Sequence, residues 1–277
     1  VELRVDSSRP IILVAEDNPI NQEVVRSQLA RLGFTTRVVS NGQEALEAYR
    51  TGGYSAILMD LHMPVMGGTQ ASRQIRDCES EQPSGEAASA VERKRIPIIA
   101  MTADTLERDR ERCEQAGMDD YLSKPVTLEQ LKSTLARHIK IDDAAAQSLT
   151  TGARKQSKAQ QVLTEKFFDA SHLCDEYGDE TAVRMLQLFL KRTPELLEVM
   201  EQEVQSADFD RLRASAHELK GSCLVVQIES MSSLSRALEE AAETKNGAAT
   251  SDILVDLKRK FATVRGLLEQ TLSALGQ

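Results

Sequence analysis

The sequence predicts a chain of two domains: an α/β domain with a doubly wound, five-stranded parallel sheet, then an all-α domain that is an antiparallel four-helix bundle. Three observations predict this order. The 277 residues are enough for two ordinary domains. Up to about residue 140, short β-branched segments alternate with amphipathic helical ones, which is typical of a parallel sheet with helices on both faces. From about Val162 onward, every hydrophobic pattern has the helical period.

Five short segments are expected to form the strands, with helices between them: Ile11–Ala15, Phe34–Val39, Ser55–Met59, Ile96–Met101 and Tyr121–Leu122. Capping-box or related spacings indicate three helix starts, at Asn41 with Glu44, Asp104 with Glu107, and Thr127 with Gln130. The polar segment Ser80–Arg95 breaks the alternation. It is predicted to be an extended surface loop before the fourth strand.

The second half of the chain is predicted to be a linker followed by the helical bundle. Residues 141–161 carry almost no large apolar side chains, which is typical of a linker, so the domains are expected at 1–140 and 162–277. Thr193-Pro194 predicts the start of a new helix, because proline fits the first helical position after an N-cap. Later helices are predicted around the apolar stripes that begin at Phe209, Met231 and Leu254.

Composition and charge exclude several classes of protein. The chain has 43 acidic and 34 basic residues and a net charge of −9, which argues against nucleic acid or an anionic membrane as a partner. No apolar run approaches the roughly 20 residues of a membrane span. Four cysteines and four histidines share no ligand spacing, which argues against a structural zinc site. We expect a cytoplasmic fragment of a larger protein, whether or not that parent is anchored in the inner membrane.

Charged and polar side chains follow four of the five predicted strands: Glu16 and Asp17 the first, Asp60 the third, Thr102 the fourth and Lys124 the fifth. The carboxyl ends of parallel strands meet at one edge of a sheet, where ligands bind. Each residue alone has an ordinary interpretation as a cap, a turn residue or a solvated side chain. Five such residues, each at the carboxyl end of a predicted strand, favour a binding site instead. Clustered carboxylates need a cation, and hard oxygen ligands suit Mg²⁺. With a lysine and a hydroxyl, Mg²⁺ forms a clamp for a phosphoryl group.

Four segments that carry these residues resemble the response-regulator receiver domain over about residues 9–140: Leu13–Asn18, Met59–Gly68, Met101–Ala103 and Tyr121–Pro125. The resemblance implies a flavodoxin-like fold in which Asp60 is the phosphoacceptor. It also implies that Mg²⁺ is held by Glu16, Asp17, Asp60 and the backbone carbonyl of His62. Lys124 would contact the phosphoryl oxygens, Thr102 would move toward the phosphate, and Tyr121 would rotate inward as a switch. The Glu-Asp pair in place of Asp-Asp is a variant of receivers attached to sensor kinases.

A histidine on the predicted bundle has an unusual set of neighbours. His217 follows the core position Ala216, and Arg213, Lys220 and Gly221 lie at helical spacing from it. The ordinary interpretation is an exposed histidine without a role. Two nearby cations would instead disfavour imidazolium and keep the ring nucleophilic, and glycine would let a partner approach closely.

The segment Ala216–Cys223 resembles the histidine phosphotransfer (HPt) motif His-x-x-Lys-Gly-Ser, over about residues 162–277. The resemblance implies that His217 carries a phosphoryl group and that Lys220 and Gly221 shape its approach. The chain departs from the family at Gln227-Ile228-Glu229, where a glycine-containing turn is common.

Together the two resemblances predict a phosphorelay module from the C-terminal part of a hybrid sensor histidine kinase. A kinase domain of the parent chain would phosphorylate Asp60, and the phosphoryl group would pass to His217 and then to a downstream response regulator. No P-loop or glycine-rich nucleotide lid occurs in the sequence, so the chain is expected to transfer phosphate without using ATP itself. Transfer within one chain and transfer between chains both remain open.

Three other functions compete with this interpretation. An interaction module that has lost its chemistry conflicts with the retained Asp60, Thr102, Lys124 and His217. A phosphatase of the haloacid dehalogenase type needs a second aspartate two residues after the nucleophile, where this chain has His62. A flavin or dinucleotide binder would need a glycine-rich first turn.

Overall fold

A computed structural model describes residues 9–80, 95–102, 107–140 and 170–275. The chain divides into two compact units, residues 1–154 and 155–277, and each is described by itself. The predicted linker 141–161, the cap at Asp104 and most of the predicted loop Ser80–Arg95 lie outside the described residues. The exact domain boundaries therefore stay predictions.

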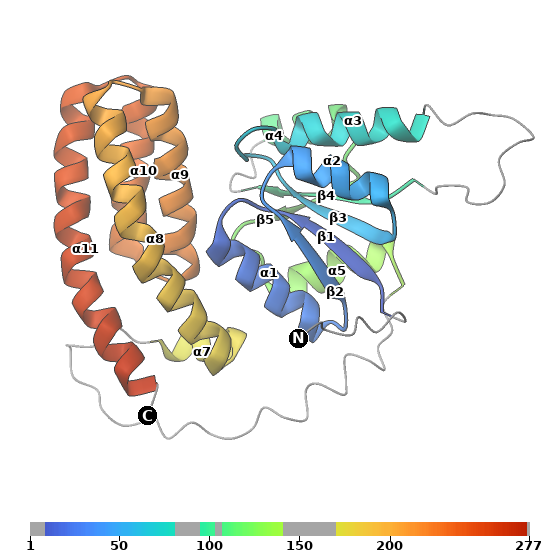
Figure 1. The fold of residues 1–277 in the computed structure, drawn as a ribbon, viewed down its shortest axis with the longest axis horizontal. Helices are drawn as coiled ribbons and strands as arrows, with labels where there is room; N and C mark the ends of the chain where they lie inside the picture. Colours follow the sequence, from blue (N-terminus) through green and yellow to red (C-terminus); the bar gives the residue numbers. More distant parts are fainter. Residues whose placement is uncertain (1–8, 81–94, 103–106, 141–169, 276–277) are drawn as a thin grey trace, which may run out of the picture. The chain divides into compact units, whose positions relative to one another are not determined.

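The first unit is a five-stranded parallel sheet with the order β2-β1-β3-β4-β5. Its strands are β1 (Ile11–Ala15), β2 (Thr35–Val39), β3 (Tyr54–Asp60), β4 (Ile98–Thr102) and β5 (Asp120–Ser123). Its helices are α1 (Pro19–Arg31), α2 (Gly42–Thr51), α3 (Gly68–Ser80), α4 (Glu107–Gln115) and α5 (Leu128–His138). Figure 1 shows α1 and α5 on one face of the sheet and α2, α3 and α4 on the other, which confirms the predicted doubly wound architecture.

Two apolar cores cover the two faces of the sheet, because successive side chains of a strand point to opposite faces. In β1, Ile12 and Val14 join the core with α1 and α5, whereas Leu13 and Ala15 join the core with α2 and α3. The first strand has its predicted bounds, and the ends of the other four differ from the prediction by at most two residues. The fourth strand begins at Ile98 rather than Ile96, after Pro97, which has no N–H for the sheet.

The second unit contains a short helix, α7 (Ser171–Tyr177), and four long ones that run side by side in Figure 1. The long helices are α8 (Asp179–Gln205), α9 (Phe209–Val225), α10 (Glu229–Glu243) and α11 (Gly247–Leu275). They confirm the predicted four-helix bundle, packed around buried residues from every long helix: Met185, Phe189, Leu212, Leu219, Leu238, Leu257 and Leu268. No helix in the described part of the chain is long and apolar enough to cross a bilayer.

The helix start predicted at Thr193-Pro194 was wrong, because α8 runs through Pro194 without a break. An internal proline removes one helical hydrogen bond and costs about 3 kcal/mol. The buried face of α8 is continuous across this point, however, since Phe189, Thr193 and Leu197 are all buried. Burial of that face outweighs the local preference of proline.

Helices in both units end in Schellman motifs, but with different residues at the left-handed position. After α1 and α4 this position is glycine: Gly33 and Gly117. After α9 it is Gln227, with φ 59°. The Gln227 N–H donates to Leu224 O at 3.2 Å and the Ile228 N–H to Cys223 O at 2.8 Å, the bond pattern of this cap. The turn after the histidine motif therefore forms without the glycine that is common in the resembling family.

Replacing Gln227 with glycine is expected to raise the free energy of unfolding of the bundle by roughly 0.5–1 kcal/mol. A left-handed backbone conformation is strained for glutamine but unstrained for glycine. The greater entropy of glycine in the unfolded state offsets part of this gain in stability. Thermal unfolding followed by far-UV circular dichroism measures the effect. Gln227→Ala keeps the strain and should leave the Tm nearly unchanged, and a lower Tm for Gln227→Gly would contradict the interpretation.

Candidate functional site

Three predicted acidic residues come together at the carboxyl edge of the sheet. Strands β1 and β3 are neighbours, and Ala15 pairs with Met59. The next residue along each chain segment, Glu16 after Ala15 and Asp60 after Met59, therefore lies beside the other. Carboxylate oxygens of Glu16, Asp17 and Asp60 all lie within 4.8 Å of one another. Glu16 and Asp60 are buried, and Asp17 is half-buried.

Lys124 connects two of these carboxylates. Its Nζ lies 2.6 Å from Glu16 Oε2 and 2.6 Å from Asp60 Oδ2. Its backbone N–H donates to the Thr102 carbonyl at 2.7 Å, which fixes the segment after β5 against the end of β4. The structure thus brings together Glu16, Asp17, Asp60 and Lys124, as the sequence predicted.

The charges of this cluster shift the pKa values of its members. Burial raises the pKa of Glu16 to about 7, although the nearby Lys124 charge opposes the shift. Burial disfavours the ammonium form of Lys124, but the charges of Asp60 and Glu16 outweigh it and hold the pKa of Lys124 above its ordinary value. Three carboxylates share one ammonium group, so the cluster has an excess of negative charge. Carboxylate oxygens at this spacing, two of them from buried residues and one from a half-buried residue, fit a hard divalent cation. Such a cation retains some water molecules among its ligands.

The start of α1 orients Glu16. Asn21 Nδ2 donates to Glu16 Oε1 at 2.9 Å, and Gln22 Nε2 donates to the Glu16 carbonyl at 2.6 Å. Asn18 caps the helix, because its Oδ1 accepts from the Ile20 N–H at 2.9 Å, and Pro19 follows at the first helical position. The local sequence of α1 therefore fixes the direction of an acidic side chain in the site.

Asp60 is held from two sides. Its Oδ2 faces Lys124, and its Oδ1 accepts from the His62 backbone N–H at 3.2 Å. The His62 side chain is exposed.

Gly68, at the start of α3, permits the close approach of this helix to β3, because any Cβ there would collide with the Asp60 carbonyl oxygen. Gly68 lies in a segment that resembles the receiver motif, but this packing requirement is visible only in the structure.

The two predicted switch residues occupy the neighbouring strands. Thr102 is buried at the end of β4, next to Asp60 in the sheet order. Tyr121 in β5 is half-buried, and the Arg110 guanidinium carbon lies 4.6 Å from the centre of its ring. Thr102 thus lies on the strand next to β3 and Tyr121 on the strand after that. Their movement stays a prediction.

His217 in the bundle belongs to a second polar cluster. Its side chain is 29% exposed, and its Nδ1 lies 2.8 Å from Glu239 Oε1. The other carboxylate oxygen, Oε2, accepts from Lys220 Nζ at 2.7 Å. Burial alone would raise the pKa of Glu239, but hydrogen bonds from His217 and Lys220 lower it to about 2. One carboxylate of α10 therefore joins the histidine and the lysine of α9.

This geometry corrects the expected electrostatics of the histidine. The sequence predicted two cations beside His217, but the ammonium of Lys220 is paired with Glu239, and Arg213 is exposed. Sequence reasoning missed Glu239, because the carboxylate comes from another helix. The sequence did carry a signal for Glu239. It comes directly after a core residue, Leu238, just as His217 comes directly after the core residue Ala216, so both side chains are expected at the edge of the core. Gly221 is half-buried one residue after Lys220.

The low pKa of Glu239 predicts how pH acts on this cluster. Because the folded-state pKa is about 2 against an ordinary value of 4.5, the ionised carboxylate stabilises the fold above pH 4.5. That contribution is lost as the pH falls toward 2. Carboxyl ¹³C NMR of Glu239 should show a midpoint well below the ordinary glutamate value of 4.5. A midpoint near 4.5 would contradict the cluster.

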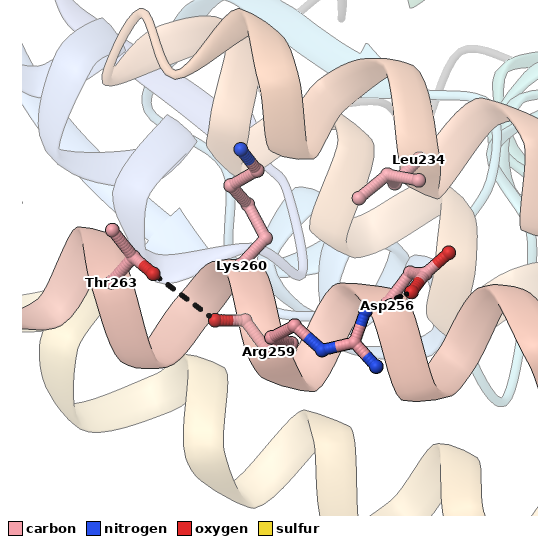
Figure 2. A pocket seen from close by; sticks show the side chains of 5 residues that line it. All are labelled: Leu234, Asp256, Arg259, Lys260 and Thr263. Carbon is pink, nitrogen blue, oxygen red and sulfur yellow. Dashed lines mark hydrogen bonds and ion pairs between the residues drawn. The ribbon is translucent and has the colours of Figure 1, made fainter.

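A pocket between α10 and α11 lies apart from the predicted site residues. Figure 2 shows its lining: Leu234, Asp256, Arg259, Lys260 and Thr263. Arg259 pairs with Asp256 at 2.8 Å, so the charge of Arg259 is already compensated. The lining includes neither His217 nor Glu239, and the pocket has no part in the site.

The fold and the two clusters define a class of protein: a chain that joins a parallel α/β domain with an acidic, lysine-containing site to a helical bundle with a histidine site. Comparison with known families identifies the two domains. Residues 12–136 match the family described as the response regulator receiver domain, and residues 184–277 match the Hpt domain. The chain therefore contains a receiver domain and an Hpt domain, the two domain types of a two-component phosphorelay.

Curated relatives include a histidine kinase, a hybrid signal transduction protein and a virulence sensor protein. Histidine kinase 5 of Arabidopsis thaliana is 38% identical over 151 residues, 48% of this chain and 16% of that protein. The hybrid signal transduction protein dokA of Dictyostelium discoideum is 45% identical over 141 residues, 50% of this chain and 8% of that protein. The virulence sensor protein BvgS of Bordetella bronchiseptica is 29% identical over 267 residues, 95% of this chain and 20% of that protein. The chain thus spans at most a fifth of these relatives.

A solved structure is also similar to the first domain. The receiver domain of the sensor histidine kinase PA1611 from Pseudomonas aeruginosa is 41% identical, with a TM-score of 0.40, and the match covers 47% of this chain and 98% of that one. That protein was crystallised with a magnesium ion in its active-site cleft.

Proposed function

We propose that the chain passes a phosphoryl group from a kinase phosphohistidine to Asp60, from Asp60 to His217, and from His217 to a downstream response regulator. One observation carries the proposal most directly: Lys124 lies 2.6 Å from both Glu16 and Asp60 at the carboxyl edge of a parallel sheet. Phosphoryl transfer depends mostly on positioning and on neutralising charge, and this cluster supplies both.

In the first step, a carboxylate oxygen of Asp60 attacks the phosphorus of the donor phosphohistidine. A P–O bond forms, the P–N bond breaks, and the donor imidazole leaves with its electron pair. The His62 N–H and Lys124 hold the two oxygens of Asp60 in fixed directions. Glu16, Asp17, Asp60 and the His62 carbonyl would hold Mg²⁺. This ion supplies the charge neutralisation that the phosphoryl oxygens require beyond Lys124.

In the second step, His217 attacks the phosphorus of the aspartyl phosphate. Its Nδ1 faces the Glu239 carboxylate at 2.8 Å, so the proton resides on Nδ1 and the lone pair on Nε2. The Nε2–P bond forms, the acyl P–O bond breaks, and the Asp60 carboxylate is restored. Glu239 stabilises the positive charge that develops on the ring, Lys220 orients Glu239, and Gly221 leaves room for the incoming domain. Exposed Arg213 offers a positive charge to that domain.

Phosphorylation of Asp60 would also act on the neighbouring strands. Thr102 is buried beside Asp60, and its hydroxyl would turn toward the phosphate. Tyr121 would then rotate inward from its position under Arg110. These movements would change the surface of β4 and β5 according to the phosphorylation state.

The relatives suggest the partners of this module. They include a histidine kinase and a hybrid signal transduction protein, of which the chain spans only a small part, so the donor would be the kinase domain of a hybrid parent. The acceptor would be the receiver of a separate response regulator, and both reactions would take place in the cytoplasm.

The test is labelling with acetyl phosphate and Mg²⁺, read by intact mass and site mapping. Wild type should carry phosphate on Asp60 and His217, Asp60→Asn on neither, and His217→Gln on Asp60 alone. A folded wild type without label, or label on His217 in Asp60→Asn, would overturn the proposed order. Transfer within one chain would make the rate of labelling at His217 independent of protein concentration.

A further inference from the structure

A glutamine in the core of the first domain connects α1 with the segment that carries Lys124. Gln28 is fully buried, and its neighbours Val25 and Leu29 belong to the apolar core between the sheet and the helices α1 and α5. Its Nε2 donates to the Val126 carbonyl at 2.7 Å, across 98 residues of sequence. Val126 lies two residues after Lys124 and immediately before Thr127, the N-cap of α5.

This glutamine makes one buried hydrogen bond and leaves its second polar atom unsatisfied. Its Oε1 is buried and has no hydrogen-bond partner in the part of the chain that the structure describes, and such a group lowers stability. The amide cannot be reversed, because the Val126 carbonyl accepts and needs a donor. An apolar side chain of similar size would remove the unpaired Oε1, but it would also leave the Val126 carbonyl without this donor. The contribution of the amide is therefore to hold that carbonyl in place.

The Lys124 segment is held at two points. Upstream, the Lys124 N–H donates to the Thr102 carbonyl at 2.7 Å. Downstream, Gln28 binds the Val126 carbonyl. Between these points the Lys124 side chain reaches Asp60 and Glu16. Because α1 begins directly after Glu16 and Asp17, the same helix that orients Glu16 also fixes the lysine segment.

We propose that Gln28 is a positioning residue for phosphorylation of Asp60: its amide bond to Val126 fixes the segment that places Lys124 between Glu16 and Asp60. This inference rests on the proposed function, in which Lys124 acts on the phosphoryl group. Small displacements of a positioned group reduce rates strongly, so loss of this bond should slow the reaction while leaving the fold intact.

The experiment is a double-mutant cycle on the full chain, with acetyl phosphate and Mg²⁺ as the probe. Gln28→Met keeps the side-chain volume but cannot donate to Val126. It should slow labelling of Asp60 roughly tenfold. The same change is then made in the slower Lys124→Ala variant, with labelling of Asp60 followed over longer times. There it should alter the labelling rate less than about twofold, because Gln28 acts on the reaction only through Lys124. Hydrogen exchange of the Lys124 amide should also accelerate in Gln28→Met.

Ser72→Ala is the matched control, since Ser72 on α3 is likewise fully buried with an unpaired hydroxyl in the described structure but lies on the other face of the sheet. It should leave the labelling rate unchanged. Gln28→Leu provides a second variant if Gln28→Met fails to fold. Equal slowing in both Lys124 backgrounds, or wild-type labelling by Gln28→Met, would overturn the inference alone. An unlabelled wild type would overturn the proposed function and this inference with it.

Discussion

Replacing Lys124 with alanine is expected to slow phosphorylation of Asp60 by roughly 10²–10³-fold, the loss typical of one charge-stabilising donor in an active site. Lys124 is the cation that contacts both Asp60 and Glu16, at 2.6 Å each. Without it, the phosphoryl oxygens lose their lysine partner. In addition, two buried carboxylates face each other with no ammonium between them.

The rate is measured from the time course of Asp60 labelling at saturating Mg²⁺. Lys132→Ala, which removes an exposed lysine of α5, is the matched control and should label at the wild-type rate. The variant should also gain more thermal stability from Mg²⁺ than wild type does, because a divalent cation replaces the missing positive charge between the carboxylates. A Lys124→Ala rate within threefold of wild type would remove Lys124 from the mechanism.

The acidic site could be predicted from sequence because its geometry follows from strand order. Glu16 follows β1 and Asp60 is the last residue of β3. Parallel strands end at the same edge of a sheet whatever the packing around them. The alternation of segments predicted the sheet itself, and the helical stripes predicted the bundle. Local residue preferences were less reliable. Pro194 lies inside α8, and Gln227 adopts a left-handed conformation, since burial and capping hydrogen bonds outweigh the preferences of single residues.

Contacts between distant elements could not be predicted from the sequence. Gln28 binds a carbonyl 98 residues away, and in the sequence it is one more polar residue in an amphipathic helix. Glu239 meets His217 across two helices whose rotation about their axes depends on the whole bundle. The sequence thus identified the residues proposed to carry the phosphoryl group but not the residues that hold them in place.

Replacing Glu239 with glutamine is expected to slow transfer from Asp60 to His217 by roughly 10–100-fold, the usual effect of losing a group that orients a histidine. The amide has no charge to stabilise the ring as Nε2 attacks phosphorus, and Lys220 loses its counter-ion. If the amide turns its NH₂ toward Nδ1, it also favours the tautomer with the proton on Nε2. The prediction therefore concerns the second transfer alone, because Asp60 lies in a separately folded domain.

The measurement separates the two steps. Labelling is started with acetyl phosphate and Mg²⁺ and quenched at short times, and phosphate on Asp60 and His217 is counted separately. Glu239→Gln should label Asp60 at the wild-type rate, accumulate aspartyl phosphate and fill His217 slowly. Glu240→Gln, a change at the next, exposed position of α10, should behave as wild type. Unchanged filling of His217 in Glu239→Gln would mean that the carboxylate merely compensates Lys220. In that case the tautomer of His217 would have to be set by some other contact.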